Sequence, residues 1–317
     1  VAVVSVVYSP NFFLSAGGAV FLVGTVMLSA AVVERTSLEE FAKILVATFV
    51  LGLVVGILFF FIKPSIGKHG AGVIRLSGVY GANLTGATAG MLTGICTSLW
   101  YKKRIRFYSF FLGAGLGFLC LIASVSRGAM GAFVISGIGT VILARRKFGT
   151  AFTVFLVVSM IGVIVWELFG LNLDSVVAII SRSGSAEEIY NLTGRLTLWV
   201  LSIKLIVQAP IIGYGFGGAR AVLVEGLKGS TWTTTHAHNF ILQNTIMLGG
   251  VGLFMLFGIV YHQIRGVINY HLPSIDFITI YILVYGMTTS IISKQPTVML
   301  TLWFSTVLWR SKAQKYI

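Results

Sequence analysis

The chain has 317 residues, of which 56% are hydrophobic and only 10% are charged, and this composition excludes an ordinary soluble globular domain. Its formal net charge of +14 would suggest nucleic acid as the partner of a soluble protein, but the mean hydropathy of +0.94 points to a lipid bilayer instead. Apolar runs separated by short charged connections predict a polytopic α-helical membrane protein, because the strands of a β-barrel would alternate in polarity. We therefore expect the lipid bilayer, and no nucleic acid, among its partners.

The predicted fold is all-α: one transmembrane helical bundle of about nine spans, forming a single domain over residues 1–317. The spans are expected at residues 14–33, 41–62, 82–100, 107–125, 128–144, 148–169, 240–262, 275–292 and 297–309. The chain begins inside an apolar run, Val1 to Tyr8, which we interpret as the end of a further span cut off upstream. Cys96 and Cys120 both lie in apolar runs, which predicts small buried residues and no disulfide.

Basic clusters at three connections predict the orientation of the spans. The clusters lie at residues 102–106, 145–147 and 310–315, and even numbers of predicted spans separate them. They therefore fall on one side of the membrane, which the positive-inside rule makes the cytoplasm. The opposite, periplasmic side receives the other loops, and their many lysines and arginines against few acidic residues predict an anionic ligand there.

The longest connection, residues 170–237, is predicted to be a periplasmic segment inserted between two spans. A connection of this length is uncommon unless it has a function of its own. Its apolar stretch at 196–207 is too short to cross a bilayer, so we expect a short helix that lies in the interface or re-enters the membrane partway. Pro210 ends this stretch, a glycine-rich turn follows to Gly218, and we expect Ala219 and Arg220 to lead into a polar loop.

Three arginines fall on the predicted periplasmic side. Arg127 lies between two apolar runs with almost no loop, where a charge is costly unless it pairs, reaches the surface or lines a polar cavity. Arg195 opens the short apolar stretch, and Arg75 lies just before the span at 82–100. Each could be an ordinary interfacial or flanking charge. Three guanidinium groups on one face nevertheless favour phosphate binding, because the planar guanidinium group can donate two parallel hydrogen bonds to phosphate oxygens.

Two histidines stand directly before the span at 240–262, in the sequence His236-Ala-His238-Asn239. A histidine near a membrane interface is often structural, but a neutral imidazole at the water boundary can also act as a general base. Because neither a third ligand nearby nor any Asp-x-Asp pattern accompanies the pair, we expect no metal site and no cofactor. His238, which precedes Asn239, is the predicted catalytic base, with His236 and Asn239 in support.

At these residues the sequence resembles the superfamily of O-antigen ligases and O-antigen polymerases, membrane proteins of the bacterial envelope. The resemblance covers most of the chain from Arg75 onward, and its elements share an order and a predicted membrane face. These elements are Arg75-x-x-Gly with Asn83, Ser126-Arg127-Gly128-Ala129, Gly194-Arg195 with Leu198-Trp199, the turn from Pro210 to Gly217, and His238-Asn239 followed by Gly249-x-x-Gly252. The chain departs from the family in having fewer spans and in carrying the extra His236.

The resemblance implies glycan transfer from an undecaprenyl-pyrophosphate-linked glycan to an acceptor hydroxyl at the periplasmic face of the bacterial inner membrane. Arg127, Arg195 and Arg75 would then bind the pyrophosphate, with Asn83 in support, and His238 would remove the acceptor's proton. The histidine motif favours a ligase with lipid A-core as acceptor.

Two alternatives remain open. An O-antigen or exopolysaccharide polymerase would use the same donor and the growing glycan as acceptor. An anion transporter would use the arginines to bind the anion on its way across the membrane. The sequence, however, has neither a series of acidic residues within the spans nor a pair of interrupted helices in matching halves of the chain. A deep cavity on the acceptor side would indicate the enzyme, whereas a pathway open alternately to both faces would indicate transport.

Overall fold

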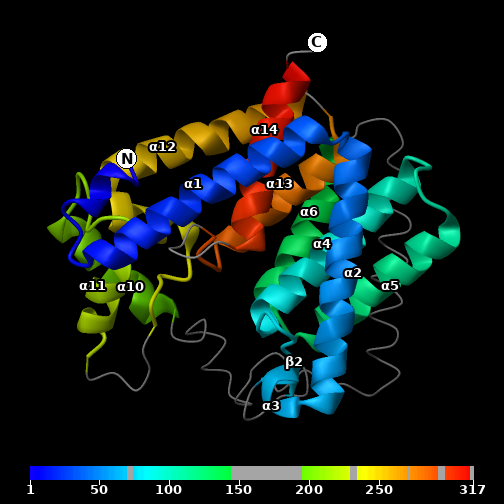
Figure 1. Cartoon of the computed structure of the whole chain (residues 1–317), viewed down its shortest axis with the longest axis horizontal. Helices are drawn as coiled ribbons and strands as arrows, with labels where there is room; N and C mark the ends of the chain where they lie inside the picture. Colours follow the sequence, from blue (N-terminus) through cyan, green and yellow to red (C-terminus); the bar gives the residue numbers. More distant parts are fainter. Residues whose placement is uncertain (70–73, 144–194, 229–233, 270, 292–296, 315–317) are drawn as a thin grey trace. The chain divides into compact units, whose positions relative to one another are not determined.

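The computed structural model describes residues 1–69, 74–143, 195–228, 234–269, 271–291 and 297–314 (Figure 1). The predicted span at 148–169 and residues 170–194 of the long segment lie outside this part of the chain. The contacts divide the chain into two compact units, which are described separately. Unit 1 comprises Val1–Leu38, Gly194–Tyr270 and Ile282–Ile317, and unit 2 comprises Glu39–Thr193 and His271–Tyr281. The single domain expected from the sequence stays a prediction.

Eight of the predicted spans coincide with helices. These are α1 (Phe12–Arg35), α2 (Leu38–Ile62), α4 (Ala82–Tyr101), α5 (Phe107–Ala123), α6 (Arg127–Leu143), α12 (Phe240–Asn269), α13 (Pro273–Gly286) and α14 (Val298–Gln314). Within the described residues, α1, α2 and α12 are long and apolar enough to cross a membrane, and α5, α6 and α13 are apolar but shorter. The chain is a helical membrane protein, and its number of spans stays a prediction.

The remaining elements are short. They are η1 (Val4–Val6), α3 (Pro64–Gly67), α10 (Arg195–Gln208), α11 (Gly218–Gly226), and the two-residue strands β1 (Lys68–His69) and β2 (Arg75–Leu76), which pair antiparallel. The expected short helix after Arg195 is α10. The expected polar loop after Gly218 was wrong, because residues 218–226 form α11 instead. Ala219 and Leu223, one turn apart, are almost fully buried, so packing of this face stabilises a helix that the sequence did not predict.

Unit 2 is built around α4. Three glycines spaced by four residues leave one stripe of this helix without side chains. A Cβ atom on Gly86 would lie 2.4 Å from the Ser124 hydroxyl, and one on Gly90 would lie 2.6 Å from the Tyr281 hydroxyl. The small residues therefore let the turn before α6, and α13, approach the α4 backbone. This packing also explains the modest hydropathy of α4, because most of the helix faces protein.

In unit 1, α1 runs beside α14 (Figure 1). The Ser29 hydroxyl donates to the Thr301 carbonyl at 3.1 Å, and the Lys312 ammonium donates to the Val33 carbonyl at 2.7 Å. The second contact satisfies a carbonyl at the C-terminal end of α1, where a cation is favoured by the helix dipole.

The α12 helix is interrupted at Gly249, whose backbone has φ 61° and ψ −155°, a conformation that is open essentially only to glycine. The turn that follows α10 pairs with the broken helix. Gly250 N–H donates to the Pro210 carbonyl at 2.7 Å, and Tyr214 N–H donates to the Ile246 carbonyl at 2.9 Å. In a bilayer an unpaired backbone group is very costly, so this turn makes the interruption possible. The part of α12 before the break, residues 240–248, begins directly after the two histidines, so the pairing at the break also fixes the position of this part of the helix.

Candidate functional site

The loop that carries the two histidines is anchored at its centre. Ala237, between His236 and His238, is fully buried, and both of its backbone groups are engaged. Its N–H donates to Gln243 Oε1 at 2.8 Å, and its carbonyl accepts from Trp199 Nε1 at 3.2 Å. The imidazole rings on either side are therefore held close together, with ring centroids 4.2 Å apart and planes tilted by 47°.

Asn239 links His238 to the start of α12. Its Oδ1 accepts from the N–H groups of Ile241 and Leu242 at 2.9 and 3.1 Å, which makes it the N-cap of the helix. Its Nδ2 donates to the Met287 carbonyl at 3.2 Å. His238 itself has φ 50°, in the left-handed region that non-glycine residues rarely adopt and that is common at functional sites. The asparagine of the His-Asn motif thus positions the histidine.

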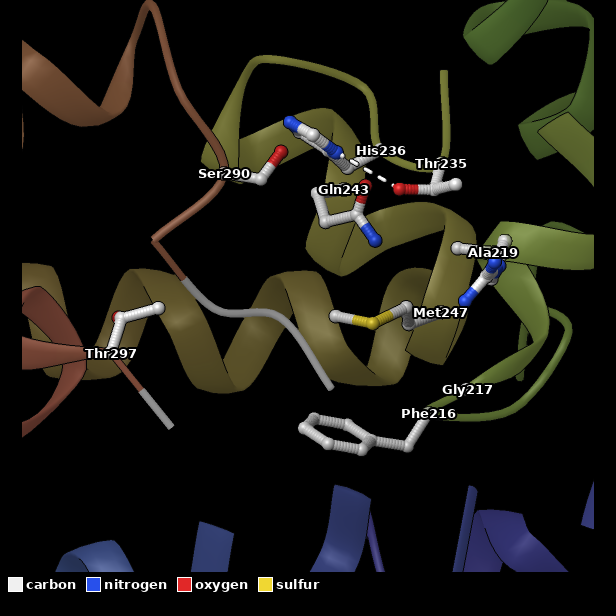
Figure 2. Close-up of a pocket in the computed structure, with 10 residues that line it drawn as sticks. Phe216, Gly217, Ala219, Thr235, His236, Gln243, Met247, Ser290 and Thr297 are labelled. Carbon is white, nitrogen blue, oxygen red and sulfur yellow. Dashed lines mark hydrogen bonds between the residues drawn. The ribbon is translucent and has the colours of Figure 1, made fainter. Parts of the chain in front are cut away.

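A cavity of about 240 Å³ lies beside this loop within unit 1 (Figure 2). His236 lines it, together with residues from the glycine-rich turn, the first turn of α11, α12 and the approach to α14. The other lining residues are Phe216, Gly217, Ala219, Arg220, Thr235, Gln243, Met247, Ser290 and Thr297. The set combines one guanidinium group, an imidazole, an amide and hydroxyls with the three apolar side chains of Phe216, Ala219 and Met247. A concave site with a few convergent polar groups is the usual form of a ligand pocket.

Arg195 belongs to the same unit. It opens α10 four residues before Trp199, so the two side chains lie on one face of the helix. Because Trp199 donates to the histidine loop, this face of α10 is the one turned toward the loop. The structure thus brings together the helix turn of Arg195 and the predicted His236, His238 and Asn239.

The other predicted residues form a separate group in unit 2. Arg75 is only 2% exposed; its Nε donates to the Ser124 carbonyl at 2.8 Å and its Nη2 to Asn83 Oδ1 at 2.9 Å. Ser124 lies three residues before Arg127, which begins α6. Arg75 and Asn83 are therefore in contact, and Arg75 also holds the turn that leads to Arg127.

Among the lining residues that the sequence analysis did not select, two carry a guanidinium group or an amide. Arg220 was assigned to a polar loop, although its place directly after a glycine-rich turn is also typical of a helix start. Gln243 lies four residues after Asn239, on the first turn of α12, and this spacing was the available signal.

The described residues contain no group of three or more His, Cys, Asp and Glu side chains arranged to hold a metal ion. The two histidine rings lie close together, but within this part of the chain no third metal ligand accompanies them. The expectation of a site without metal stays a prediction.

Burial lowers the pKa of the His236 imidazole below its ordinary value near 6.5. The ring is therefore neutral around pH 7 and can accept a proton or a hydrogen bond at one nitrogen. The Thr235 hydroxyl lies 3.3 Å from His236 Nδ1.

This shift predicts an acid-dependent loss of stability. As the pH falls below about 6.5, the unfolded chain takes up a proton at His236 before the folded protein does, so the free energy of unfolding decreases. The contribution is complete above that pH and is lost as the pH approaches the lower pKa of the folded state. Melting temperatures of the wild type and His236→Gln between pH 7.5 and 5 should diverge, with the wild type falling more steeply. Parallel profiles for the two proteins would contradict the assignment.

The fold and this geometry define a helical membrane protein with a histidine-bearing, cation-lined cavity. Residues 112–257 match the protein family described as O-Antigen ligase. The matched stretch contains Arg127, Arg195, His236, His238 and Asn239. The resemblance to the O-antigen ligase superfamily is thereby confirmed over this stretch.

Individual proteins give the same indication. The chain is 33% identical over 82 residues to a Rickettsia felis protein provisionally named a polysaccharide ligase, an alignment that covers 24% of this chain and 20% of that protein. It is 25% identical over 232 residues to a Rickettsia prowazekii protein with the same provisional name, covering 69% of this chain and 55% of that protein. The chain thus spans about half the length of one relative and a fifth of the other.

Proposed function

We propose that the chain transfers a glycan from an undecaprenyl-pyrophosphate carrier to an acceptor hydroxyl at the periplasmic face of the bacterial inner membrane, without a metal ion. The observation that carries the proposal is the pair of anchored histidines beside a polar cavity, within the stretch that matches the ligase family. The acceptor is lipid A-core if the chain is a ligase, and the growing glycan if it is a polymerase.

In this mechanism His238 removes the proton from the acceptor hydroxyl as its oxygen attacks the anomeric carbon of the donor sugar. The bond between that carbon and the pyrophosphate oxygen breaks, and undecaprenyl pyrophosphate leaves with the electron pair. The left-handed backbone of His238 and the cap made by Asn239 support this role, because they fix the backbone position of His238 before substrate arrives. His236, neutral and 4.2 Å away between ring centroids, is placed to orient His238 or the acceptor.

The arginines supply the charge that the departing pyrophosphate requires. Arg195 is supported by its place on the face of α10 that contacts the histidine loop. Arg127 is supported by the anchored turn at Ser124. Arg75 already donates to two partners inside the protein, so we assign it the task of holding Asn83 and the Arg127 turn in place.

The arginine assignment predicts that a change to lysine will not be tolerated. Arg127→Lys and Arg195→Lys should each lower the transfer rate roughly ten- to a hundredfold, because an ammonium cannot make a forked contact and each lost charge-assisted contact costs about 1.5–3 kcal/mol. The measurement is the transfer rate at fixed donor concentration with purified protein and a lipid-linked glycan.

The matched controls are Arg106→Lys in unit 2 and Arg265→Lys in unit 1, both at exposed arginines. They should retain the wild-type rate. If Arg127→Lys and Arg195→Lys also retain it while the proteins fold normally, the two arginines do not bind the pyrophosphate.

A further inference from the structure

The cavity beside the histidine loop carries an excess of hydrogen-bond donors. We propose that it is a phosphate-binding pocket in which Arg220 is the cation, with Gln243 and the first turn of α11 as further donors. None of these groups belongs to the arginine set of the sequence motifs. The pocket is argued from its own geometry, and only the identity of its natural ligand rests on the proposed function.

The first group of donors comes from α11. Gly217 is the N-cap of this helix; its own N–H donates to Ser15 Oγ at 2.9 Å and the Gly218 N–H donates to the Gly215 carbonyl at 2.9 Å, so Ala219 and Arg220 carry the N–H groups that this turn offers to an anion. The first N–H groups of a helix lack partners within the helix and carry its positive dipole end, which favours an anion. Gly217, Ala219 and Arg220 all line the cavity, so this helix end faces it. Arg220 adds a full charge on the same turn and forms no ion pair with any carboxylate in the described part of the chain.

The second, independent group is Gln243. Its side chain is only 4% exposed, and its Oε1 accepts from the Ala237 N–H at 2.8 Å. Because that N–H requires an acceptor, the orientation of the amide is fixed and Nε2 is the atom left to face the cavity. Figure 2 shows the nitrogen pointing into the space between the lining side chains. Within the described residues, no hydrogen-bond partner of Nε2 is present.

Two hydroxyls add to this set. Ser290 Oγ is buried and has no hydrogen-bond partner among the described residues. The Thr297 hydroxyl accepts from the Leu300 N–H at 3.1 Å, which leaves its proton to donate. Both residues line the cavity.

The charges around the cavity favour an oxyanion. No carboxylate occurs among the described lining residues, and Glu225, near the far end of α11, pairs with Lys228 at 2.5 Å. Several convergent donors and one planar guanidinium match the acceptor oxygens of a phosphate group. A volume of about 240 Å³ is small for a ligand pocket and suits phosphate or pyrophosphate better than a whole glycan.

The test measures binding of inorganic pyrophosphate to the purified full chain in detergent at low salt, with no acceptor present. Arg220→Ala should weaken binding roughly ten- to a hundredfold, through loss of a charge-assisted contact. Gln243→Glu should weaken it at least as much, because it keeps an oxygen for the Ala237 N–H but places a negative charge in the pocket. Arg265→Ala, at an exposed cation of α12 that does not line the cavity, should bind like the wild type. Thermal melting confirms that each variant is folded.

The proposal is overturned if the wild type fails to bind pyrophosphate, or if folded Arg220→Ala and Gln243→Glu bind it with unchanged affinity. Competition identifies the source of the phosphate, and either result supports the pocket. Displacement of pyrophosphate by polyprenyl pyrophosphate assigns the donor lipid, whereas displacement by phosphatidylglycerol vesicles alone assigns a phospholipid headgroup. If the protein binds pyrophosphate in a way that depends on Arg220 but transfers no glycan, the proposed function is contradicted and the phosphate-binding pocket is still supported.

Discussion

Replacing His238 with alanine should lower the turnover number for glycan transfer by roughly 10²–10⁴-fold, the usual contribution of a general base, while donor binding persists. The reason is that arginines hold the charge of the donor in the proposed mechanism, whereas His238 removes the proton of the acceptor. His236→Ala should be milder, since this ring supports the first. His262→Ala is the control, because His262 Nε2 lies 3.4 Å from the Ser311 hydroxyl and is not among the described residues that line the cavity beside the histidine loop.

The experiment compares donor affinity and single-turnover rate for each variant in the same detergent, with folding checked by melting. If His238→Ala abolishes donor binding but leaves turnover at saturating donor unchanged, His238 is a phosphate ligand. A larger loss for His236→Ala than for His238→Ala would instead move the base to the histidine that lines the cavity.

The second large effect is expected at the break in α12. Gly249→Ala forces a side chain into a backbone conformation with φ 61°, and the added Cβ would lie 2.3 Å from the Ile211 carbonyl carbon. Strain at such a position costs about 1–3 kcal/mol, and the clash with backbone atoms adds to it. The variant should therefore melt several degrees below the wild type and lose transfer activity, since the turn at Pro210 can no longer pair with the broken helix.

Gly258→Ala provides the matched control in the same helix. A Cβ at this position meets nothing within 4 Å, and alanine favours a helix over glycine by roughly 0.5–1 kcal/mol. This variant should melt at or slightly above the wild-type temperature. Equal melting temperatures for Gly249→Ala and Gly258→Ala would show that the interruption is not required by the fold.

Sequence patterns predicted the long helices well because length and hydropathy are local properties. The eight coinciding spans lie on their helices, and the largest differences are at three C-terminal ends: α12 continues to Asn269 and α14 to Gln314, whereas α13 already ends at Gly286. The nine-residue α11 was missed because its stability comes from Ala219 and Leu223, which belong to one buried cluster with residues of α10 and α12. The break at Gly249 was missed for the same reason, since its partner at Pro210 lies far away in sequence.

The site was partly predictable. Motifs selected His238, Asn239 and the arginines. The structure adds contacts that motifs do not state: Asn239 caps a helix, and Arg75 donates hydrogen bonds to Asn83 and to the Ser124 carbonyl. Arg220 could not be selected from the sequence, because only the fold of the glycine-rich turn places it at the cavity.

The most direct test of the proposed glycan transfer is reconstitution with purified full chain and an undecaprenyl-pyrophosphate-linked glycan. Either lipid A-core or a second lipid-linked repeat serves as acceptor, and His238→Ala is run in parallel. We expect the wild type to release undecaprenyl pyrophosphate and to form one new glycan product, on lipid A-core if the chain is a ligase, with His238→Ala nearly inactive. A folded wild-type protein that consumes no donor with either acceptor, or a His238→Ala variant with the wild-type rate, would contradict the account.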